Sequence, residues 1–372
     1  GFRFVGNAAI GSAVAVEELR RAYSVVVLAY GASTDRHLGV PGEDLEGSHA
    51  ATAFVAWYNT HPDFVGEKFS LDTERAVVVG MGNVALDVAR VLLRSPDDLA
   101  ATDIADHALE ALRKSRVREV VLLGRRGPAQ AAFDQGELKD IVDLPNIAVS
   151  VEGDVSLEVP ADADAAVRKN VELLRTLPRE PPADAERRLR LLFLASPVEL
   201  VGQGKRVVAI RYEDTELVDK GGSVSARGTG RTHELETGFV VRSIGYQGLP
   251  IPGVPFDAKK GVIPNEAGRV LGEDKRPLPG LYVTGWIKRG PSGLIGTNKA
   301  CAKETTDQAL ADLATLPTPT GDPNALVARF TDAVGFDHWR AIDTHELEEG
   351  KTRGKVRHKI ATVAAMLAAA KK

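Results

Sequence analysis

The sequence contains a single cysteine, Cys301, among 372 residues. One thiol cannot form an intramolecular disulfide or a CxxC pair, and an iron–sulfur cluster needs several thiolate ligands. The eight histidines show no HExxH or Cys/His spacing, so a metal centre is not expected. The chain also lacks the GxSxG motif of many hydrolases. These absences exclude a built-in dithiol relay and a cluster ligated by this chain's own thiolates.

The sequence also lacks a large excess of positive or negative charge and lacks long apolar runs. The formal net charge is -4, which argues against a general nucleic-acid binder. No apolar run is long enough to cross a bilayer, and no signal peptide is recognisable. The low cysteine count is typical of a reducing compartment, so we expect a cytoplasmic protein. With 44% hydrophobic residues, the chain can bury two domains of ordinary size.

A strand–helix–strand pattern begins near residue 72. Residues 75–80 read as a short buried strand, Asn83–Leu93 as a helix, and 117–124 as a second strand. This order predicts an α/β fold with a parallel sheet and a right-handed crossover. Residues 220–231 are rich in Gly, Ser and Thr and predict a loop.

The most specific local signal is the run Gly80-Met81-Gly82-Asn83-Val84-Ala85. It is a GxGxxA fingerprint placed between a predicted strand and a predicted helix, which is the context that dinucleotide binding requires. Gly80 permits a tight turn, Gly82 lets the backbone approach a pyrophosphate, and Ala85 allows close helix–strand packing. The alternative is a glycine turn without a ligand. The context favours dinucleotide binding.

The second predicted strand ends in Arg125 and Arg126. An NAD site has an acidic residue after this strand for the ribose 2′-hydroxyl, whereas guanidinium groups pair bidentately with a 2′-phosphate. The pair lies farther from Gly80 than usual, and a helix predicted over residues 103–115 absorbs the difference. A solvated basic turn is the alternative. Together with the fingerprint, the pair favours NADP(H).

A glycine-rich segment, residues 285–298, follows the last predicted strand and opens a helix. Its backbone N–H groups suit the electron-rich edge of a flavin, and Trp286 offers a flat apolar wall. The alternative is a helix N-cap loop with a core tryptophan, and this segment alone does not separate the two. Lys288 and Arg289 are candidates for docking an acidic partner, although exposed basic residues are usually only solvated.

The chain resembles ferredoxin–NADP⁺ reductases of the adrenodoxin reductase type, especially the actinobacterial members. The resemblance is carried by four stretches, residues 79–90, 124–133, 242–246 and 285–298. The resemblance covers nearly the whole chain, and Gly-Trp-Ile-Lys-Arg-Gly-Pro is its most specific part. It implies two dinucleotide-binding, Rossmann-like domains. An NADP domain, residues 72–240, is expected to be inserted into a discontinuous FAD domain, residues 1–71 and 241–372.

The resemblance also implies roles for individual residues. Glu137 matches an acidic residue that orients the nicotinamide and is the one catalytic candidate, although Gly136 beside it weakens the local helix by up to about 1 kcal/mol. The implied NADP contacts are Gly80, Met81, Gly82, Asn83, Val84, Arg125, Arg126, Glu137 and Gly293. The implied FAD contacts are Trp286, Gly293, Leu294 and Ile295.

The implied activity is that of an oxidoreductase that moves hydride between NADPH and FAD and single electrons to an acidic, ferredoxin-like iron–sulfur protein. The single cysteine agrees with an external acceptor. An NADPH-input subunit of a larger complex, as in glutamate synthase, and a non-catalytic NADP-binding module are the alternatives. The family's FAD-pyrophosphate fingerprint does not occur after Gly1, so we expect the chain to begin inside a longer reading frame.

Overall fold

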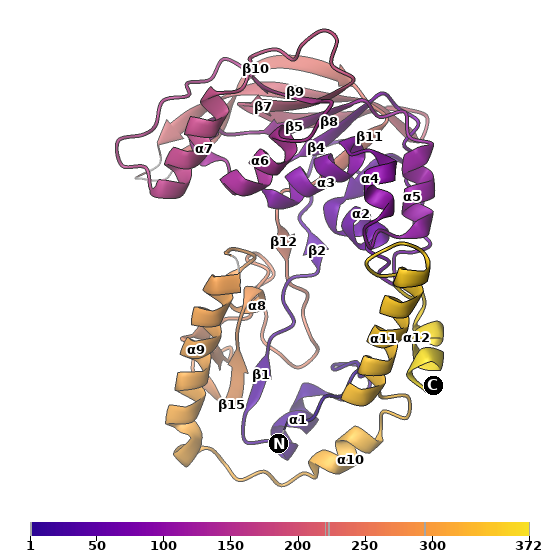
Figure 1. Cartoon of the computed structure of the whole chain (residues 1–372). Coiled ribbons are helices and arrows are strands. Elements are labelled where there is room, and N and C mark those ends of the chain that lie inside the picture. The colour runs from indigo at the N-terminus through magenta and orange to yellow at the C-terminus, as the bar shows by residue number, and fades with distance from the viewer. Residues whose placement is uncertain (1, 220, 222–223, 294, 372) are drawn as a thin grey trace. The chain divides into compact units, whose positions relative to one another are not determined.

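The computed structural model describes residues 2–219, 221, 224–293 and 295–371 (Figure 1). The chain divides into two compact units. Unit 1 consists of Gly1–Arg36, Gly245–His345 and Val363–Lys372, and unit 2 of His37–Ile244 and Glu346–Thr362. One unit is therefore inserted into the other, and the predicted class, two α/β units with a discontinuous outer one, is confirmed.

A six-stranded sheet forms the centre of unit 2, and every neighbouring pair of its strands is parallel. The continuous apolar runs of the sequence are the strands buried on both faces, as expected for a parallel sheet. In sheet order the strands are β3 (Ser48–Ala50), β11 (Phe239–Arg242), β4 (Arg75–Val79), β5 (Glu119–Gly124), β7 (Arg187–Phe193) and β6 (Ile147–Glu152).

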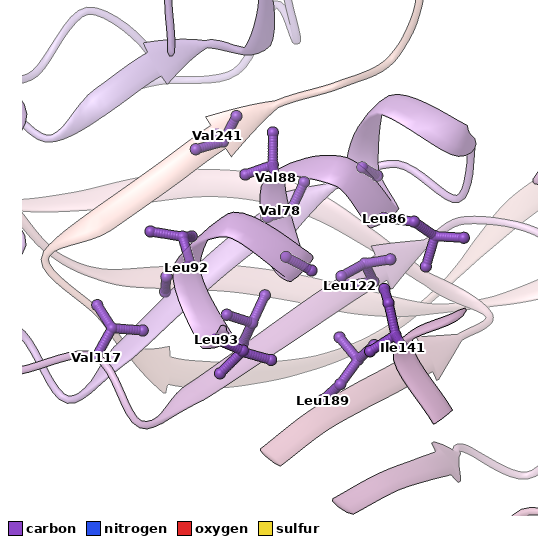
Figure 2. Packing of buried hydrophobic residues seen from close by; sticks show 14 of the residues in the cluster. Val78, Leu86, Val88, Leu92, Leu93, Val117, Leu122, Ile141, Leu189 and Val241 are labelled. Atoms are coloured by element: carbon purple, nitrogen blue, oxygen red, sulfur yellow. The ribbon is translucent and has the colours of Figure 1, made fainter. Parts of the chain in front are cut away.

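Helices of unit 2 bury their apolar faces against this sheet. Helix α3 spans Asn83–Leu93, the range predicted from the sequence, and its Leu86 and Leu93 share a buried cluster with the strand residues Leu122 and Leu189 (Figure 2). The other helices are α2 (Ala51–Tyr58), α4 (Pro96–Ala100), α5 (Asp106–Arg113), η1 (Pro128–Gln130), α6 (Gln135–Val142) and α7 (Ala165–Arg175).

An antiparallel sheet in the order β10-β9-β8 completes unit 2. Its strands are β8 (Ala195–Gln203), β9 (Arg206–Asp219) and β10 (Val224–Glu236). The prediction of a loop over residues 220–231 was therefore wrong from Val224 onward, while 220, 222 and 223 lie outside the described residues. Strand β10 is largely exposed, and its backbone pairing with β9 tolerates polar and small side chains, with a register shift between Gly228 and Thr232.

The observed boundaries of the units differ from residues 71/72 and 240/241, where the sequence suggested them. Strand β3 pairs with β11 in the parallel sheet, so residues 37–71 belong to unit 2. A second segment, Glu346–Thr362, joins the same unit, where Lys359 Nζ lies 2.7 Å from Asp103 Oδ2. Such pairings join residues far apart in the sequence and leave no local pattern.

Unit 1 contains a small mixed sheet in the order β1-β15-β14-β13, in which β1 and β15 are parallel. Its strands are β1 (Val26–Leu28), β13 (Asn265–Glu266), β14 (Arg269–Leu271) and β15 (Pro277–Val283), and β2 (Thr34–Asp35) pairs separately with β12 (Tyr246–Gln247). The helices are α1 (Val16–Ala22), α8 (Trp286–Arg289), α9 (Ile295–Asp312), η2 (Leu313–Thr315), α10 (Pro323–Ala328), α12 (Val363–Ala370) and α11 (Phe336–Thr352), which crosses the unit boundary after His345.

Among the described residues, none of the helices combines the length and apolar character that a membrane span requires.

Candidate functional site

The turn between β4 and α3 depends on two glycines in different ways. Gly80 has a φ of 137°, and a Cβ atom there would lie 2.1 Å from the carbonyl oxygen of Ser243. Gly82 is the N-cap of α3, with a φ of -118°, and a Cβ atom there would meet nothing within 4 Å. Only glycine fits the first position, whereas the second faces open space in which the backbone is accessible.

No side chain of the described residues caps the N-terminus of α3. The first N–H groups of a helix lack intrahelical partners and carry partial positive charge, which suits a phosphate. Because the turn is open at Gly82, a pyrophosphate can approach these groups. The arrangement is the one that the GxGxxA fingerprint predicts.

The side chains of Met81 and Asn83 have structural partners. Met81 packs against Gly124 of the next strand, where a Cβ atom would lie 2.5 Å from Met81 Cγ. Asn83 Oδ1 accepts a hydrogen bond of 2.7 Å from the backbone N–H of Asp134. Val84 is half-buried against the core. Any phosphate contact from these residues therefore uses mainly the backbone, and the unusual Met81 is accommodated by packing.

Arg125 and Arg126 follow β5, the neighbour of β4, so the fold brings the arginine pair to the same sheet edge as the glycine turn. Arg125 is exposed and Arg126 is half-buried. Within the described part of the chain, neither guanidinium group has a carboxylate or other hydrogen-bond acceptor, although both carbonyl oxygens are bonded. Two unpaired guanidinium groups beside an open turn are suited to an anionic group.

Glu137 lies in the first turn of α6, where its side chain is 38% exposed. Its Oε2 accepts a hydrogen bond of 3.3 Å from Arg90 Nη1 on α3. Asp134 caps α6 by accepting a 2.9 Å bond from the N–H of Gly136, which offsets the low helix propensity of that glycine. Glu137 is thus oriented by an arginine from another helix.

Arg90 also binds Asp87, three residues earlier on α3, and approaches Asp140 at 3.9 Å. Burial raises the pKa of Asp87, Arg90 opposes this effect, and the nearby charge of Glu137 adds to it. Sequence reasoning did not single out Arg90 or Asp87. Their spacing on one helix face was visible, but nothing in the sequence indicated that Glu137 would face them.

In unit 1, Trp286 begins α8 at the end of the last strand. Its ring stacks on Tyr246, with 5.8 Å between ring centroids and an interplanar angle of 24°. The indole Nε1 is buried and has no hydrogen-bond partner among the described residues. The flanking Gly285 and Gly290 have positive φ angles of 73° and 86°, and nothing lies within 4 Å of a Cβ atom at either.

The glycine-rich segment continues through Gly293, whose φ is 77° and where a Cβ atom would lie 2.6 Å from Thr297 Oγ1. Leu294, a predicted FAD contact, lies outside the described residues. Ile295 is the first residue of α9. The segment therefore brings an aromatic wall and glycine backbone into one unit, while the predicted NADP contacts other than Gly293 belong to unit 2.

Lys288 and Arg289 stabilise this segment internally. The Lys288 side chain is only 8% exposed, and its ammonium group contacts Glu304 and donates a 3.1 Å bond to Thr305 Oγ1. Arg289 bonds Ser292 and Asn298 across the glycine-rich turn. Burial and pairing of Lys288 argue against its proposed role in docking an acidic partner.

Known proteins and a solved structure are similar to the chain over nearly its whole length. No protein-family model matches the chain. "NADPH-ferredoxin reductase FprA" of Mycobacterium tuberculosis is 45% identical over 98% of this chain and 82% of its own length. The mitochondrial "NADPH:adrenodoxin oxidoreductase" of Arabidopsis thaliana is 41% identical over 99% of this chain and 81% of its own. The solved structure "Mycobacterium tuberculosis FprA in complex with NADPH" matches with a TM-score of 0.93 and 43% identity, over 100% of this chain and 84% of that one.

Proposed function

Because the chain belongs to the family of NADPH-dependent ferredoxin and adrenodoxin reductases, we propose that it is a flavoprotein oxidoreductase that takes hydride from NADPH and delivers single electrons to an iron–sulfur protein. The observation that carries this proposal is the sheet edge of unit 2. There an open glycine turn follows β4, and the neighbouring strand β5 is followed by two guanidinium groups that have no partner among the described residues.

Each part of NADPH has a suitable group at this edge. The backbone from Gly80 to Val84 receives the pyrophosphate at the N-terminus of α3. The 2′-phosphate lies between Arg125 and Arg126, whose planar guanidinium groups form charge-assisted hydrogen bonds with phosphate oxygens. Glu137, held by Arg90, orients the nicotinamide end. No side chain acts as a covalent nucleophile, so these residues serve to position the cofactor.

The residues of unit 1 fit an FAD in three respects. Trp286 offers a flat ring with an unused N–H donor, and the backbone at Gly285 and Gly290 is free of close neighbours. When bound, FAD accepts two electrons as hydride and releases them singly. Gly293 and the start of α9 at Ile295 complete the proposed flavin contact. We therefore assign FAD to unit 1 and NADP to unit 2.

The electron acceptor is an acidic, ferredoxin-like iron–sulfur protein in the cytoplasm. The single cysteine supports an external acceptor, because this chain does not supply the thiolates of a cluster. The names of the mycobacterial and plant relatives refer to ferredoxin and adrenodoxin, which are iron–sulfur proteins.

The test replaces Arg125 and Arg126 with alanine, singly, in the full chain. Loss of one guanidinium–phosphate interaction should raise the Kd for NADPH by about 10-fold to 100-fold. The Kd for NADH, which has no 2′-phosphate, should change little. Both constants are measured by isothermal titration calorimetry. Equal losses for NADPH and NADH would remove the 2′-phosphate assignment.

A separate measurement addresses the flavin. Protein that retains FAD through purification, seen by its visible absorbance, and reduces ferricyanide with NADPH supports the reductase. Colourless protein that binds NADPH but cannot be reconstituted with FAD would instead support a binding module.

A further inference from the structure

Two hydrogen bonds hold the backbone of the loop that bears the two arginines, and a third joins the two donor residues to each other. Thr215 Oγ1 on β9 donates a bond of 2.7 Å to the carbonyl oxygen of Arg125. The N–H of Leu194 donates a bond of 3.2 Å to the carbonyl oxygen of Arg126. The N–H of Thr215 donates a bond of 2.8 Å to the carbonyl oxygen of Leu194. We call these two residues and their three bonds the carbonyl clamp.

The backbone at the clamp adopts a costly conformation. Leu194 joins β7 to β8 with a φ of 54°, in the left-handed region that a leucine rarely occupies. Such strain costs about 1–3 kcal/mol and persists only where the surroundings enforce it, often near functional sites. Here the conformation allows one residue to donate to Arg126 while accepting from Thr215.

Thr215 is itself buried, with 6% of its surface exposed. Its hydroxyl donates to a backbone carbonyl and so fixes the main chain without touching a guanidinium group. Both arginine carbonyls are occupied by the clamp, and both side chains are left without acidic partners in the described part of the chain. The loop therefore has a fixed backbone and two available cations, the arrangement that a preorganised anion site needs.

We propose that Thr215, acting through the carbonyl clamp, is a positioning residue that determines the preference for NADPH over NADH. The clamp fixes the Arg125–Arg126 backbone before the cofactor arrives, so that both guanidinium groups meet the 2′-phosphate without further ordering of the loop. This inference rests on the proposed NADP function and adds a residue that does not contact the cofactor.

The experiment compares Thr215→Val, which removes the hydroxyl at nearly constant volume, with Thr215→Ser, which keeps it. Thr237→Val is the matched control, because Thr237 is also buried and donates its hydroxyl to a backbone carbonyl, that of Arg75, at the opposite end of β4 from Gly80. Kd values for NADPH and NADH are measured by calorimetry on the full chain, and folding by thermal unfolding. Thr215→Ala is measured as well, so that the result does not depend on one variant folding.

Thr215→Val and Thr215→Ala should raise the Kd for NADPH by about threefold to tenfold, the factor that corresponds to one lost hydrogen bond. The Kd for NADH should be unchanged, and Thr215→Ser and Thr237→Val should have the Kd values of the unaltered protein for both cofactors. An unchanged Kd for NADPH in a folded Thr215→Val protein would overturn the proposal, as would equal losses for NADPH and NADH.

Arg125→Ala and Arg126→Ala, measured in the same series, distinguish a failure of the inference about Thr215 from a failure of the proposed function. If they selectively weaken NADPH binding but the Thr215 variants do not, the carbonyl clamp is only a structural feature and the proposed function stands. If the arginine variants show no selectivity for NADPH, the 2′-phosphate assignment fails and the inference about Thr215 fails with it.

Discussion

At the residue scale, Gly80 and Gly82 separate the needs of the fold from those of the ligand. A side chain at Gly80 would collide with the backbone of Ser243, and the φ of 137° excludes ordinary residues. A side chain at Gly82 would meet no protein atom within 4 Å, and its φ of -118° is open to any residue. The protein does not need glycine at the second position in order to fold, whereas the proposed contact with a pyrophosphate requires it.

We therefore predict that Gly82→Ala weakens NADPH binding by at least about 10-fold, because its methyl group occupies the space of the phosphate. Its melting temperature should change by only a few degrees, since the loss at an N-cap is small. Calorimetry and thermal unfolding measure the two effects. Gly80→Ala is the contrasting variant and should lose both binding and stability. Tight NADPH binding by Gly82→Ala would contradict the assignment.

At the element scale, a row of alternating charges crosses four strands of the parallel sheet. Arg75 on β4 binds Glu119 on β5, and Arg190 on β7 binds Glu119 at 3.1 Å and Glu152 on β6 at 2.6 Å. Burial alone would raise the pKa of Glu119, but the bonds and charges of the two arginines outweigh it and hold the pKa below its ordinary value of 4.5. The row therefore links four neighbouring strands through their side chains.

The lowered pKa of Glu119 predicts a specific pH dependence. Its contribution to stability is present above the ordinary carboxyl pKa of 4.5 and is lost as the pH falls through the lower pKa of the folded state. Glu119→Gln should reduce the free energy of unfolding at pH 7 by about 1–3 kcal/mol. The difference between the two proteins should shrink below pH 4.5, as denaturant titrations can test. A difference that stays constant down to pH 3 would exclude this role for Glu119.

At the scale of the whole molecule, the division into two units predicts where ligand protection appears. Adenosine 2′,5′-bisphosphate contains the 2′-phosphate half of NADP and lacks the nicotinamide. At 100 times its Kd it should stabilise the unit that binds it by about 2.7 kcal/mol. Hydrogen exchange should slow in unit 2 around Arg125 and Arg126 and remain unchanged in α1 and β1 of unit 1. Protection confined to unit 1 would reverse the assignment of the cofactors.

Local signals made several features predictable. The apolar run of β4, the glycines after it and the amphipathic pattern of α3 all lie within about twenty residues, and the predicted bounds of α3 were confirmed. The positions of Gly80 and Arg125 at one sheet edge followed from parallel pairing of consecutive strands. Roles that depend on a bound ligand, such as those of Glu137 and Trp286, remain predictions.

Sequence by itself thus determined the α/β class, the glycine turn and the arginine pair, because backbone geometry and helix periodicity are set by neighbouring residues. Only the tertiary structure decided that β3 joins the sheet of unit 2, that β10 is a strand, and that Thr215 and Leu194 hold the arginine loop. These features rest on hydrogen bonds between distant segments, all of them between backbone groups except the bond from the Thr215 hydroxyl to Arg125. Every residue except proline offers the same backbone N–H and C=O groups, so backbone bonds leave almost no mark on the choice of amino acid, and a single threonine in the sequence does not indicate its distant partner.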